Sequence, residues 1–244
     1  MINNSENKKV LLYSGGLDSW LIDKIWKPDI KLYIDIKGSY SSEEIRRLPP
    51  DVKVVDFPLL GKFEADDKFI PLRNLYFLMI ASNYGNELCI GAVAGDGSKD
   101  KNKEFLDRTD DMLNYLWHDK KINKDIVICK DFITKSKSEI LDIYLSQNNN
   151  IDIVRNNTFS CYSPKDGKEC FDCYPCFRKF ALLFSKGASY SYEERKSIWN
   201  YVKNNVIPTK EEGGYPGTYY TDRGEESKVL IYAVEKLKEE FSNE

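Results

Sequence analysis

The stretch Val10-Leu11-Leu12-Tyr13-Ser14-Gly15-Gly16-Leu17-Asp18-Ser19 decides how this chain is organised. Its apolar first part predicts a β-strand, and residues 20–26 have the apolar spacing of a helix. Glycines between a strand and a helix let the backbone approach a ligand closely, and the helix amides attract an anion. The stretch therefore predicts a phosphate-binding loop at the start of an α/β domain.

Three side chains of this stretch could add to the phosphate-binding loop. Ser14 and Ser19 carry hydroxyls that can donate to phosphate oxygens. Asp18 would repel bare phosphate, so its presence predicts a Mg²⁺ ion between the carboxylate and the nucleotide. The Walker pattern does not fit, because it needs a longer glycine loop that ends in Lys-Ser or Lys-Thr. The sequence Ser-Gly-Gly-x-Asp-Ser resembles the PP-loop of ATP pyrophosphatases, which implies ATP as the nucleotide.

Length and composition set the outer limits. The chain has 244 residues, of which 41% are apolar and 31% charged. This suffices for one large domain, or for a domain with a small module. The net charge of −3 gives no general attraction to nucleic acid. Residues 1–9 lack the apolar segment of a secretory signal, and no apolar run is long enough to cross a bilayer. We therefore expect a cytoplasmic protein without membrane or nucleic-acid partners.

The remaining chain alternates between strand and helix patterns. The expected strands are 10–13, 30–36, 52–56, 87–93 and 126–129, with helices between them and up to residue 145. Such alternation predicts an α/β fold with a doubly wound, mainly parallel sheet. We assign residues 1–150 to this ATP-binding domain, 151–187 to a metal loop with its helix, and 188–244 to an α-helical C-terminal extension.

Polar residues follow several expected strands, where open α/β sheets bind their ligands. Lys37 and Gly38 follow the second strand and are expected beside the adenosine. Asp96 and Ser98 lie in a glycine loop after the fourth strand. Arg73 and Asn74 fall in the first turn of a buried helix over 69–81. A guanidinium at a helix start suits a site that binds carboxylate or phosphate.

The six cysteines fall into two groups. Cys89 and Cys129 sit alone in strand-like surroundings and are expected to be buried thiols. The other four follow the spacing C-x8-C-x2-C-x2-C, namely Cys161, Cys170, Cys173 and Cys176. Four thiolates fill a tetrahedral Zn²⁺ shell and leave no position for water, so the predicted metal is structural. An iron–sulfur cluster, which also takes four cysteines, is the alternative.

Three motifs together resemble the QueC family of 7-cyano-7-deazaguanine synthases. They are the PP-loop, the sequence 71–74 before an apolar helix, and the sequence 154–162 that leads into the later cysteines. The resemblance spans roughly residues 8–185. It implies a PP-loop fold of the adenine nucleotide alpha hydrolase type, with ATP, Mg²⁺ and Zn²⁺. It also implies conversion of 7-carboxy-7-deazaguanine to the nitrile with ammonia, and a homodimeric state.

Carried over to this chain, the resemblance assigns roles to residues. Those expected to contact ATP are Tyr13, Ser14, Gly15, Gly16, Leu17, Asp18, Ser19, Lys37 and Gly38. Those expected to act in catalysis are Asp18, Ser19 and Arg73, and those expected to contact the substrate are Arg73, Asn74, Asp96 and Ser98. The lone histidine, His118, is expected at the surface and outside the chemistry.

The sequence departs from the family around the substrate. Leu72 replaces the glycine that usually precedes Arg-Asn, and the stretches 38–41 and 98–103 lack the family's usual residues. A divergent member is therefore expected. It could act on a related deazapurine, on a tRNA base, or on a protein-linked deazaguanine. A non-catalytic nucleotide-binding subunit is the remaining hypothesis.

Overall fold

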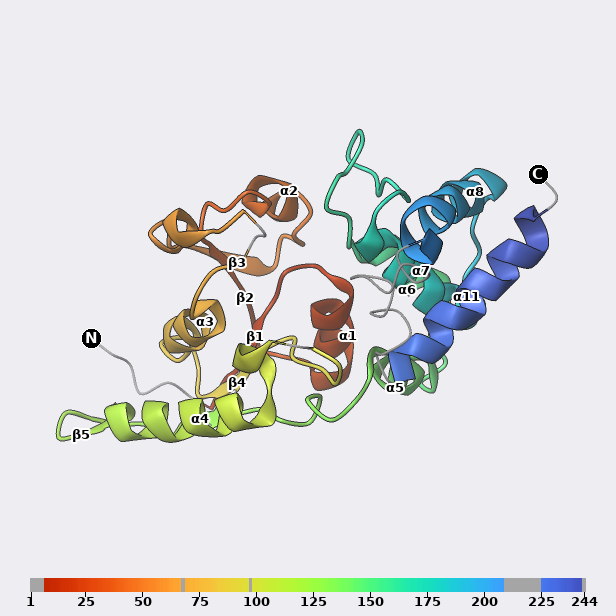
Figure 1. Ribbon diagram of the computed structural model, residues 1–244. Helices are drawn as coiled ribbons and strands as arrows, with labels where there is room; N and C mark the ends of the chain where they lie inside the picture. Colours follow the sequence, from red (N-terminus) through yellow and green to blue (C-terminus); the bar gives the residue numbers. More distant parts are fainter. Residues whose placement is uncertain (1–6, 67–68, 97, 209–224, 243–244) are drawn as a thin grey trace. The chain divides into compact units, whose positions relative to one another are not determined.

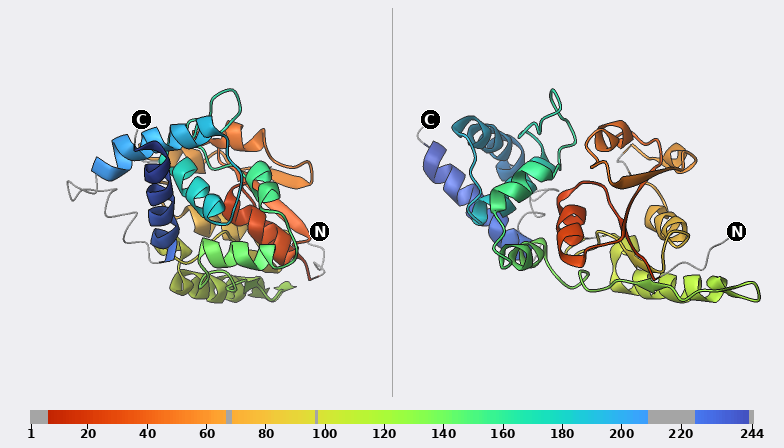
Figure 2. Two further views of the ribbon diagram at one scale, coloured as in Figure 1. Left: turned by 90° about the vertical axis from the view of Figure 1, so that its right-hand side faces the viewer. Right: turned by 180° about the vertical axis from the view of Figure 1, so that it is seen from behind.

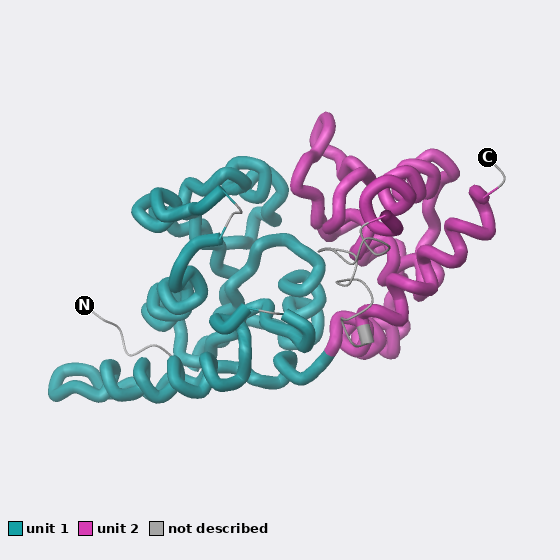
Figure 3. Tube along the Cα trace, in the orientation of Figure 1, with its two compact units in different colours: residues 1–135 teal, residues 136–244 magenta. Residues whose placement is uncertain are grey.

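The computed structural model describes residues 7–66, 69–96, 98–208 and 225–242. The chain divides into two units, residues 1–135 and 136–244 (Figure 3). The sequence-based boundaries at residues 150 and 187 stay predictions. Part of the expected C-terminal extension, residues 209–224, lies outside the described residues.

Unit 1 alternates strands and helices as the sequence predicts (Figure 1). Its strands are β1 Lys9–Leu12, β2 Ile30–Asp35, β3 Val52–Asp56, β4 Glu87–Cys89, β5 His118–Asp119, β6 Ile122–Asn123 and β7 Val127–Ile128. Its helices are α1 Leu17–Trp26, α2 Ser41–Ile45, η1 Leu60–Phe63, α3 Arg73–Ala81, η2 Lys99–Lys101 and α4 Lys103–Trp117.

Five of these strands form one parallel sheet, in the order β3-β2-β1-β4-β7. Beginning at β1, the chain adds β2 and β3 on one side and then returns to add β4 and β7 on the other. Right-handed crossovers consequently place helices on both faces, and α1 and α3 lie on opposite sides of the sheet (Figures 1 and 2). The expectation of a doubly wound parallel α/β fold is confirmed.

A hydrophobic core of unit 1 lies between the sheet and helices α3 and α4. Its side chains come from alternate strand positions and from one stripe of each helix. The core residues are Val10, Leu32, Ile34, Leu78, Ala81, Leu88, Ile90, Ala92, Leu106, Leu113, Ile126 and Ile128. Because strand side chains alternate between faces, neighbours such as Leu11 and Tyr33 are buried on the α1 side.

Unit 2 is helical. Its elements are α5 Lys137–Leu145, α6 Ile151–Asn157, α7 Tyr174–Ser185, α8 Tyr192–Tyr201, a π-helical stretch η3 Val202–Val206, and α11 Glu225–Phe241. Helix α11 packs on α7 and α8 through Leu230, Ala233 and Leu237, which are fully buried. The predicted helical tail is thus confirmed for its described part, and it folds against the helix that follows the cysteines.

Two features were not expected. The strands β5 and β6 form a two-residue antiparallel hairpin after α4. Helix α6 begins directly after the sequence-based boundary at residue 150, because Asn150 accepts a hydrogen bond from the Asp152 amide and caps the helix. Within the described part of the chain, no helix combines the length and apolar character needed to span a bilayer.

Candidate functional site

The predicted PP-loop, residues 14–19, lies at the carboxyl end of β1, the central strand of the sheet. The connection from β1 leads to β2 on one side, and the neighbour on the other side is β4. Strand order therefore reverses beside β1. Open α/β sheets bind their ligands outside the strand ends at such a reversal, so the topology puts the predicted loop at the favoured place.

Hydrogen bonds between the two serines and the glycines shape this loop. The Ser14 amide donates to Ser19 Oγ at 3.3 Å, and Ser19 Oγ donates to the Gly16 carbonyl oxygen at 3.1 Å. The Gly16 amide donates to Ser14 Oγ at 3.4 Å. Gly15 has a φ of +75°, which a residue with a side chain would adopt only with strain. The sequence SGGLDS thus closes a tight turn with Ser19 buried beneath it.

The side chains of Tyr13 and Leu17, on either side of the turn, are buried. The Tyr13 amide donates to the Leu32 carbonyl at 2.9 Å, and the Lys31 ammonium lies 5.5 Å from the centre of the Tyr13 ring. Burial, with the nearby charges of Asp23 and Asp51, raises the pKa of the Tyr13 hydroxyl. The buried side chains at these two positions anchor the loop.

The segment after β4 lies against the PP-loop. A Cβ atom at Gly91 would stand 3.7 Å from the Asp18 Cβ and 3.8 Å from the Ser19 amide nitrogen. A larger side chain at this position would reach the carboxylate and the first amides of α1. The structure therefore brings the ends of β1 and β4 together, with Asp18 between them.

The end of β2 is built around Asp35, whose side chain is almost fully buried. Asp35 accepts a hydrogen bond from the Lys37 amide at 2.9 Å and forms an ion pair with the Lys37 ammonium, which also contacts Asp56 at 2.9 Å. Burial alone would raise the pKa of Asp35, but the hydrogen bonds from Lys37 outweigh it and lower the pKa. Gly38 follows, with its amide donating to Ser41 Oγ at 3.0 Å.

Helix α3 begins with an unusual backbone. Leu72, which occupies the N-cap position, has φ 59° and ψ 14°, the left-handed conformation that favours glycine. This explains why a glycine suits this position, and it shows that the turn forms with leucine as well. The consequence is that Arg73 and Asn74 still stand in the first turn of α3, as expected.

Arg73 and Asn74 differ in their surroundings. Asn74 is buried and donates to the Asp100 carbonyl oxygen at 3.3 Å. Among the described residues, no carboxylate forms an ion pair with the Arg73 guanidinium. Asp96 forms an ion pair with Lys101 at 3.3 Å, and Ser98 Oγ donates to the Asp100 carboxylate. The loop after β4 is thereby tied to the start of α3.

Glu44 is a candidate residue that sequence reasoning missed. Its carboxylate accepts a hydrogen bond from the Tyr33 hydroxyl at 2.7 Å. Burial raises the pKa of Glu44, and the positive charge of Arg73 counteracts part of this effect. Glu44 stands in a short helix whose sequence, SSEEI, has the look of an ordinary solvated helix start. Only the fold shows that one of its two glutamates turns inward toward Arg73.

The helices differ in whether a side chain caps their first turn. The helices α4, α5, α6 and α8 each begin with a side chain that accepts a backbone hydrogen bond, from Asn102, Ser136, Asn150 and Ser191 respectively. In the described structure, α1, α2, α3 and α7 have no such side-chain cap. Of these, α1, α3 and α7 begin at the PP-loop, at Arg73 and at Cys173, so no side-chain cap takes up their first amides at the predicted sites.

The four clustered cysteines in unit 2 do meet. The Sγ atoms of Cys161, Cys170, Cys173 and Cys176 all lie within 4.8 Å of one another. Tetrahedral Zn–S bonds of about 2.3 Å require sulfur atoms about 3.8 Å apart, so a small inward movement would complete a zinc shell. In a [4Fe–4S] cluster each thiolate binds a different iron, which needs a wider spacing.

Backbone amides already surround these sulfurs. The amides of Ser163 and Cys170 donate to Cys161 Sγ, and the Asp172 amide donates to Cys170 Sγ, each at 3.3 Å. Such second-shell donors stabilise metal-bound thiolates. A hydrogen bond from Cys176, opposed by burial, lowers the pKa of Cys173 to about 5. The donor set therefore fits a thiolate-bound metal ion.

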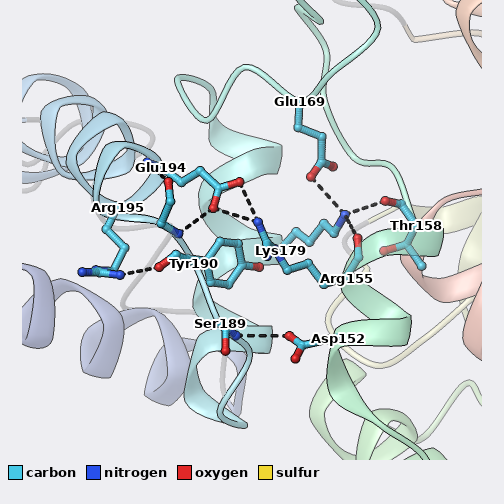
Figure 4. A network of polar contacts seen from close by, with 10 residues as sticks. Asp152, Arg155, Thr158, Glu169, Lys179, Ser189, Tyr190, Glu194 and Arg195 are labelled. Carbon is cyan, nitrogen blue, oxygen red and sulfur yellow. Dashed lines mark hydrogen bonds and ion pairs between the residues drawn. The ribbon is translucent and has the colours of Figure 1, made fainter.

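A buried polar network supports the cysteine loop (Figure 4). The Lys179 ammonium, on α7, donates to the carbonyl oxygens of Thr158 and Arg155 at 2.5 and 3.1 Å and to Glu169 Oε2 at 3.0 Å. Glu169 Oε1 accepts from the Ser160 amide at 2.7 Å. Lys179 is 4% exposed, and this burial lowers its pKa. The network thus joins α7 to both segments that carry the cysteines.

The same network continues to α8. One guanidinium nitrogen of Arg155 donates to both carboxylate oxygens of Glu194, at 2.6 and 2.7 Å. The guanidinium carbon lies 4.4 Å from the centre of the Tyr190 ring. Sequence reasoning missed Lys179, Glu169 and Glu194, because nothing in the local pattern marks a lysine or glutamate as buried.

Comparison with known proteins identifies the family. In a search of solved structures, the U34-tRNA thiolase NcsA from Methanococcus maripaludis with its [4Fe-4S] cluster matches at 14% identity. That match covers 94% of this chain and 74% of the thiolase, with a TM-score of 0.33, too low to transfer its substrate or its cluster. The sequence model described as "QueC: Queuosine biosynthesis protein QueC" matches residues 51–184, more than half of the chain, including Arg73, Asn74 and the four clustered cysteines. The chain therefore belongs to the QueC family, and with it to the ATP-using enzymes of the PP-loop superfamily.

Proposed function

We propose that this protein is an ATP-dependent carbon–nitrogen ligase, which adenylates a carboxylated deazapurine and converts it with ammonia to the amide or the nitrile. The observation that carries the proposal is the meeting of the uncapped PP-loop helix with the end of β4, where Gly91 leaves space beside Asp18. Membership of the QueC family supplies the expected substrate, 7-carboxy-7-deazaguanine, and the product, 7-cyano-7-deazaguanine.

The ATP site would be formed by the end of β1 and the end of β2. The first amides of α1 and the hydroxyls of Ser14 and Ser19 would hold the pyrophosphate part of ATP. Asp18, beside those amides, would hold the Mg²⁺ ion that offsets the phosphate charge. Lys37 is occupied by Asp35 and Asp56, so we expect it to order the turn at Gly38 beside the adenosine more than to bind phosphate.

The acidic substrate would be recognised at the start of α3. Arg73 offers a cation at an uncapped helix N-terminus, and both features favour a carboxylate. Asn74, Asp96 and Ser98 are already engaged in contacts within the protein. We therefore assign them to shaping the substrate side of the site, with Glu44 limiting the net positive charge around Arg73.

The chemistry needs no nucleophilic side chain. A carboxylate oxygen of the substrate attacks the α-phosphorus of ATP, and the bond to pyrophosphate breaks. The amides of the PP-loop stabilise the charge that develops on the leaving pyrophosphate. Ammonia then attacks the acyl carbon, AMP leaves, and the amide forms with loss of a proton. The amide oxygen can then attack the α-phosphorus of a second ATP, which releases pyrophosphate, and loss of AMP and of both protons on the amide nitrogen gives the nitrile.

For the cysteine cluster we propose a structural Zn²⁺ ion. It would be held by Cys161, Cys170, Cys173 and Cys176, and would tie the loop over residues 159–173 to the start of α7. Elemental analysis of the purified protein should find one zinc per chain and no visible absorption. A brown protein that contains four irons per chain would show the iron–sulfur alternative.

The test of the proposed reaction is product analysis by mass spectrometry. The protein is incubated with ATP, Mg²⁺, ammonium and 7-carboxy-7-deazaguanine, and AMP, amide and nitrile are measured. We expect nitrile formation that falls at least 100-fold in Asp18→Asn, since one transition-state interaction is worth about 2.7–4 kcal/mol. His118→Ala is the control and should keep full activity, because the His118 side chain is exposed and its ring nitrogens bond to Asn114 and Asp125, outside the PP-loop.

Other outcomes would redirect the assignment. Amide without nitrile would show that only the first activation occurs. AMP formation with a tRNA or with a protein-linked deazaguanine, but not with the free base, would show that the substrate is a macromolecule. ATP binding without AMP formation on any of these substrates would contradict the ligase and indicate a non-catalytic subunit.

A further inference from the structure

Two cysteines outside the metal cluster lie side by side at one end of the sheet. Cys89 is the last residue of β4, and Cys129 directly follows β7. These strands pair in parallel with Leu88 opposite Ile128. The Cys129 amide donates to the Leu88 carbonyl oxygen at 2.7 Å. Extending the register by one residue places Cys89 opposite Cys129.

Both side chains point to the same face. Leu88 and Ile128 belong to the core beneath α3 and α4, so the residue after each of them turns to the opposite face. Each thiol shifts the pKa of the other, and the Cys89 thiol donates a hydrogen bond to the Ile90 carbonyl oxygen at 3.6 Å. Facing residues on neighbouring strands have Cα atoms about 4.8 Å apart, which lies within the roughly 4.4–6.8 Å that a disulfide spans.

The two thiols differ in environment. Cys89 is 1% exposed, whereas Cys129 is partly exposed. The neighbouring Cys89 thiol lowers the pKa of Cys129, and a hydrogen bond from the Asp131 backbone adds to this against the effect of burial. The interaction with Cys129, together with burial, raises the pKa of Cys89. A partly exposed cysteine with a lowered pKa, facing a second thiol on the next strand, is the arrangement of a reactive cysteine and its resolving partner.

We propose that Cys129 is a peroxide-reactive cysteine and that Cys89 resolves it, closing a disulfide between β4 and β7. In the first step, the Cys129 thiolate attacks one peroxide oxygen, the O–O bond breaks, and the other oxygen leaves as water after taking up a proton. Cys129 is then a sulfenic acid. In the second step, the Cys89 sulfur attacks the Cys129 sulfur, the S–O bond breaks, and water leaves with the Cys89 proton. Overall, two thiols are oxidised and one hydrogen peroxide is reduced to two waters.

Trypsin offers a clean readout. Cleavage after Arg73, Lys99, Lys124 and Lys130 yields peptides 74–99 and 125–130, and each contains a single cysteine. The full-length protein, with its metal as isolated, is treated with hydrogen peroxide, and free thiols are then alkylated. We expect a linked pair of these two peptides, lighter than their sum by two hydrogens, that disappears after treatment with dithiothreitol.

Single variants separate the two roles. In Cys89→Ala, Cys129 should stop at the sulfenic acid and be trapped by dimedone. In Cys129→Ala, Cys89 should stay a free thiol at the same peroxide dose, because it is buried. The proposal is overturned if peptide 125–130 of the wild-type protein stays reduced, or if it is oxidised without a link to 74–99. This wild-type result decides the matter even if either variant folds poorly, and it does not depend on the proposed ligase activity.

Discussion

At the scale of single residues, Leu72 shows what a departure from the family costs. A left-handed backbone is unfavourable by about 1–2 kcal/mol for a residue other than glycine. Leu72 is 58% exposed and therefore gains little packing in return. We infer that the start of α3 is fixed by its surroundings, above all by the buried Asn74 and its bond to Asp100.

This argument predicts the effect of Leu72→Gly on stability. The variant should relieve the backbone strain, while glycine adds freedom to the unfolded chain. Leu59→Gly is the matched control, since Leu59 is similarly exposed but has φ −60°, which any residue adopts. In urea unfolding, the free energy of unfolding of Leu72→Gly should exceed that of Leu59→Gly by about 1–2 kcal/mol. Equal losses in both variants would contradict the left-handed strain.

Residue chemistry also marks the limit of what a sequence predicts. The SGGLDS motif and the four-cysteine spacing are local patterns, so the loop and the cluster could be located in advance. The inward turn of Glu44 toward Arg73, the left-handed backbone of Leu72 and the burial of Lys179 depend on partners distant in the sequence. No local pattern encodes them.

At the scale of elements, α7 is held to the cysteine loop by a buried ion pair. Lys179 and Glu169 are 3% and 12% exposed at their side chains. Removing one partner of a buried pair costs about 3–5 kcal/mol, because the other charge is left without compensation. We expect Lys179→Met to lower the free energy of unfolding by that amount and to reduce the metal content of the purified protein.

A thermodynamic cycle tests the pair. Combining Lys179→Met with Glu169→Gln should cost clearly less than the sum of the two single changes, since no isolated charge remains. Lys186→Met is the matched control, because its partner Asp142 is 53% exposed, and such surface pairs are worth about 0–1 kcal/mol. Additive losses for Lys179 and Glu169 would show that each acts separately.

Element boundaries were predictable where a cap or an apolar stripe defined them. The Ser136–Glu139 spacing of a capping box, which a sequence shows directly, marks the start of α5. The β5–β6 hairpin was missed because strands of two residues carry no periodicity. The change from the α-helix α8 to a π-helical stretch after Tyr201 has no comparable local signal.

At the scale of the whole molecule, each unit has its own core and only unit 2 contains the cysteine cluster. The loop over residues 159–173 has almost no regular structure, so we expect the metal to hold it. In Cys173→Ser, amide hydrogen exchange should accelerate in the loop and at the start of α7. The strands β1, β2 and β4 should keep their protection, because their core lies within unit 1.

Cys129→Ser is the control for this experiment, since it removes a thiol outside the cluster. Hydrogen exchange in unit 2 of this variant should match the wild-type protein. If Cys173→Ser instead accelerated exchange in the sheet and in the loop alike, the two units would unfold as one, and the division of the chain at residue 135 would have no energetic meaning.

The strand order has a consequence for synthesis on the ribosome. The central strand β1 emerges before the other strands of the sheet, yet its pairing with β4 begins with Lys9 and Glu87, which lie about 78 residues apart in the chain. At about 5–20 residues per second, translation needs roughly 4–16 s to supply the second neighbour of β1. During that time one edge of the strand that carries the PP-loop has no partner in the sheet. The loop at the end of β1 is thus made well before β4, the strand that completes its surroundings in the sheet.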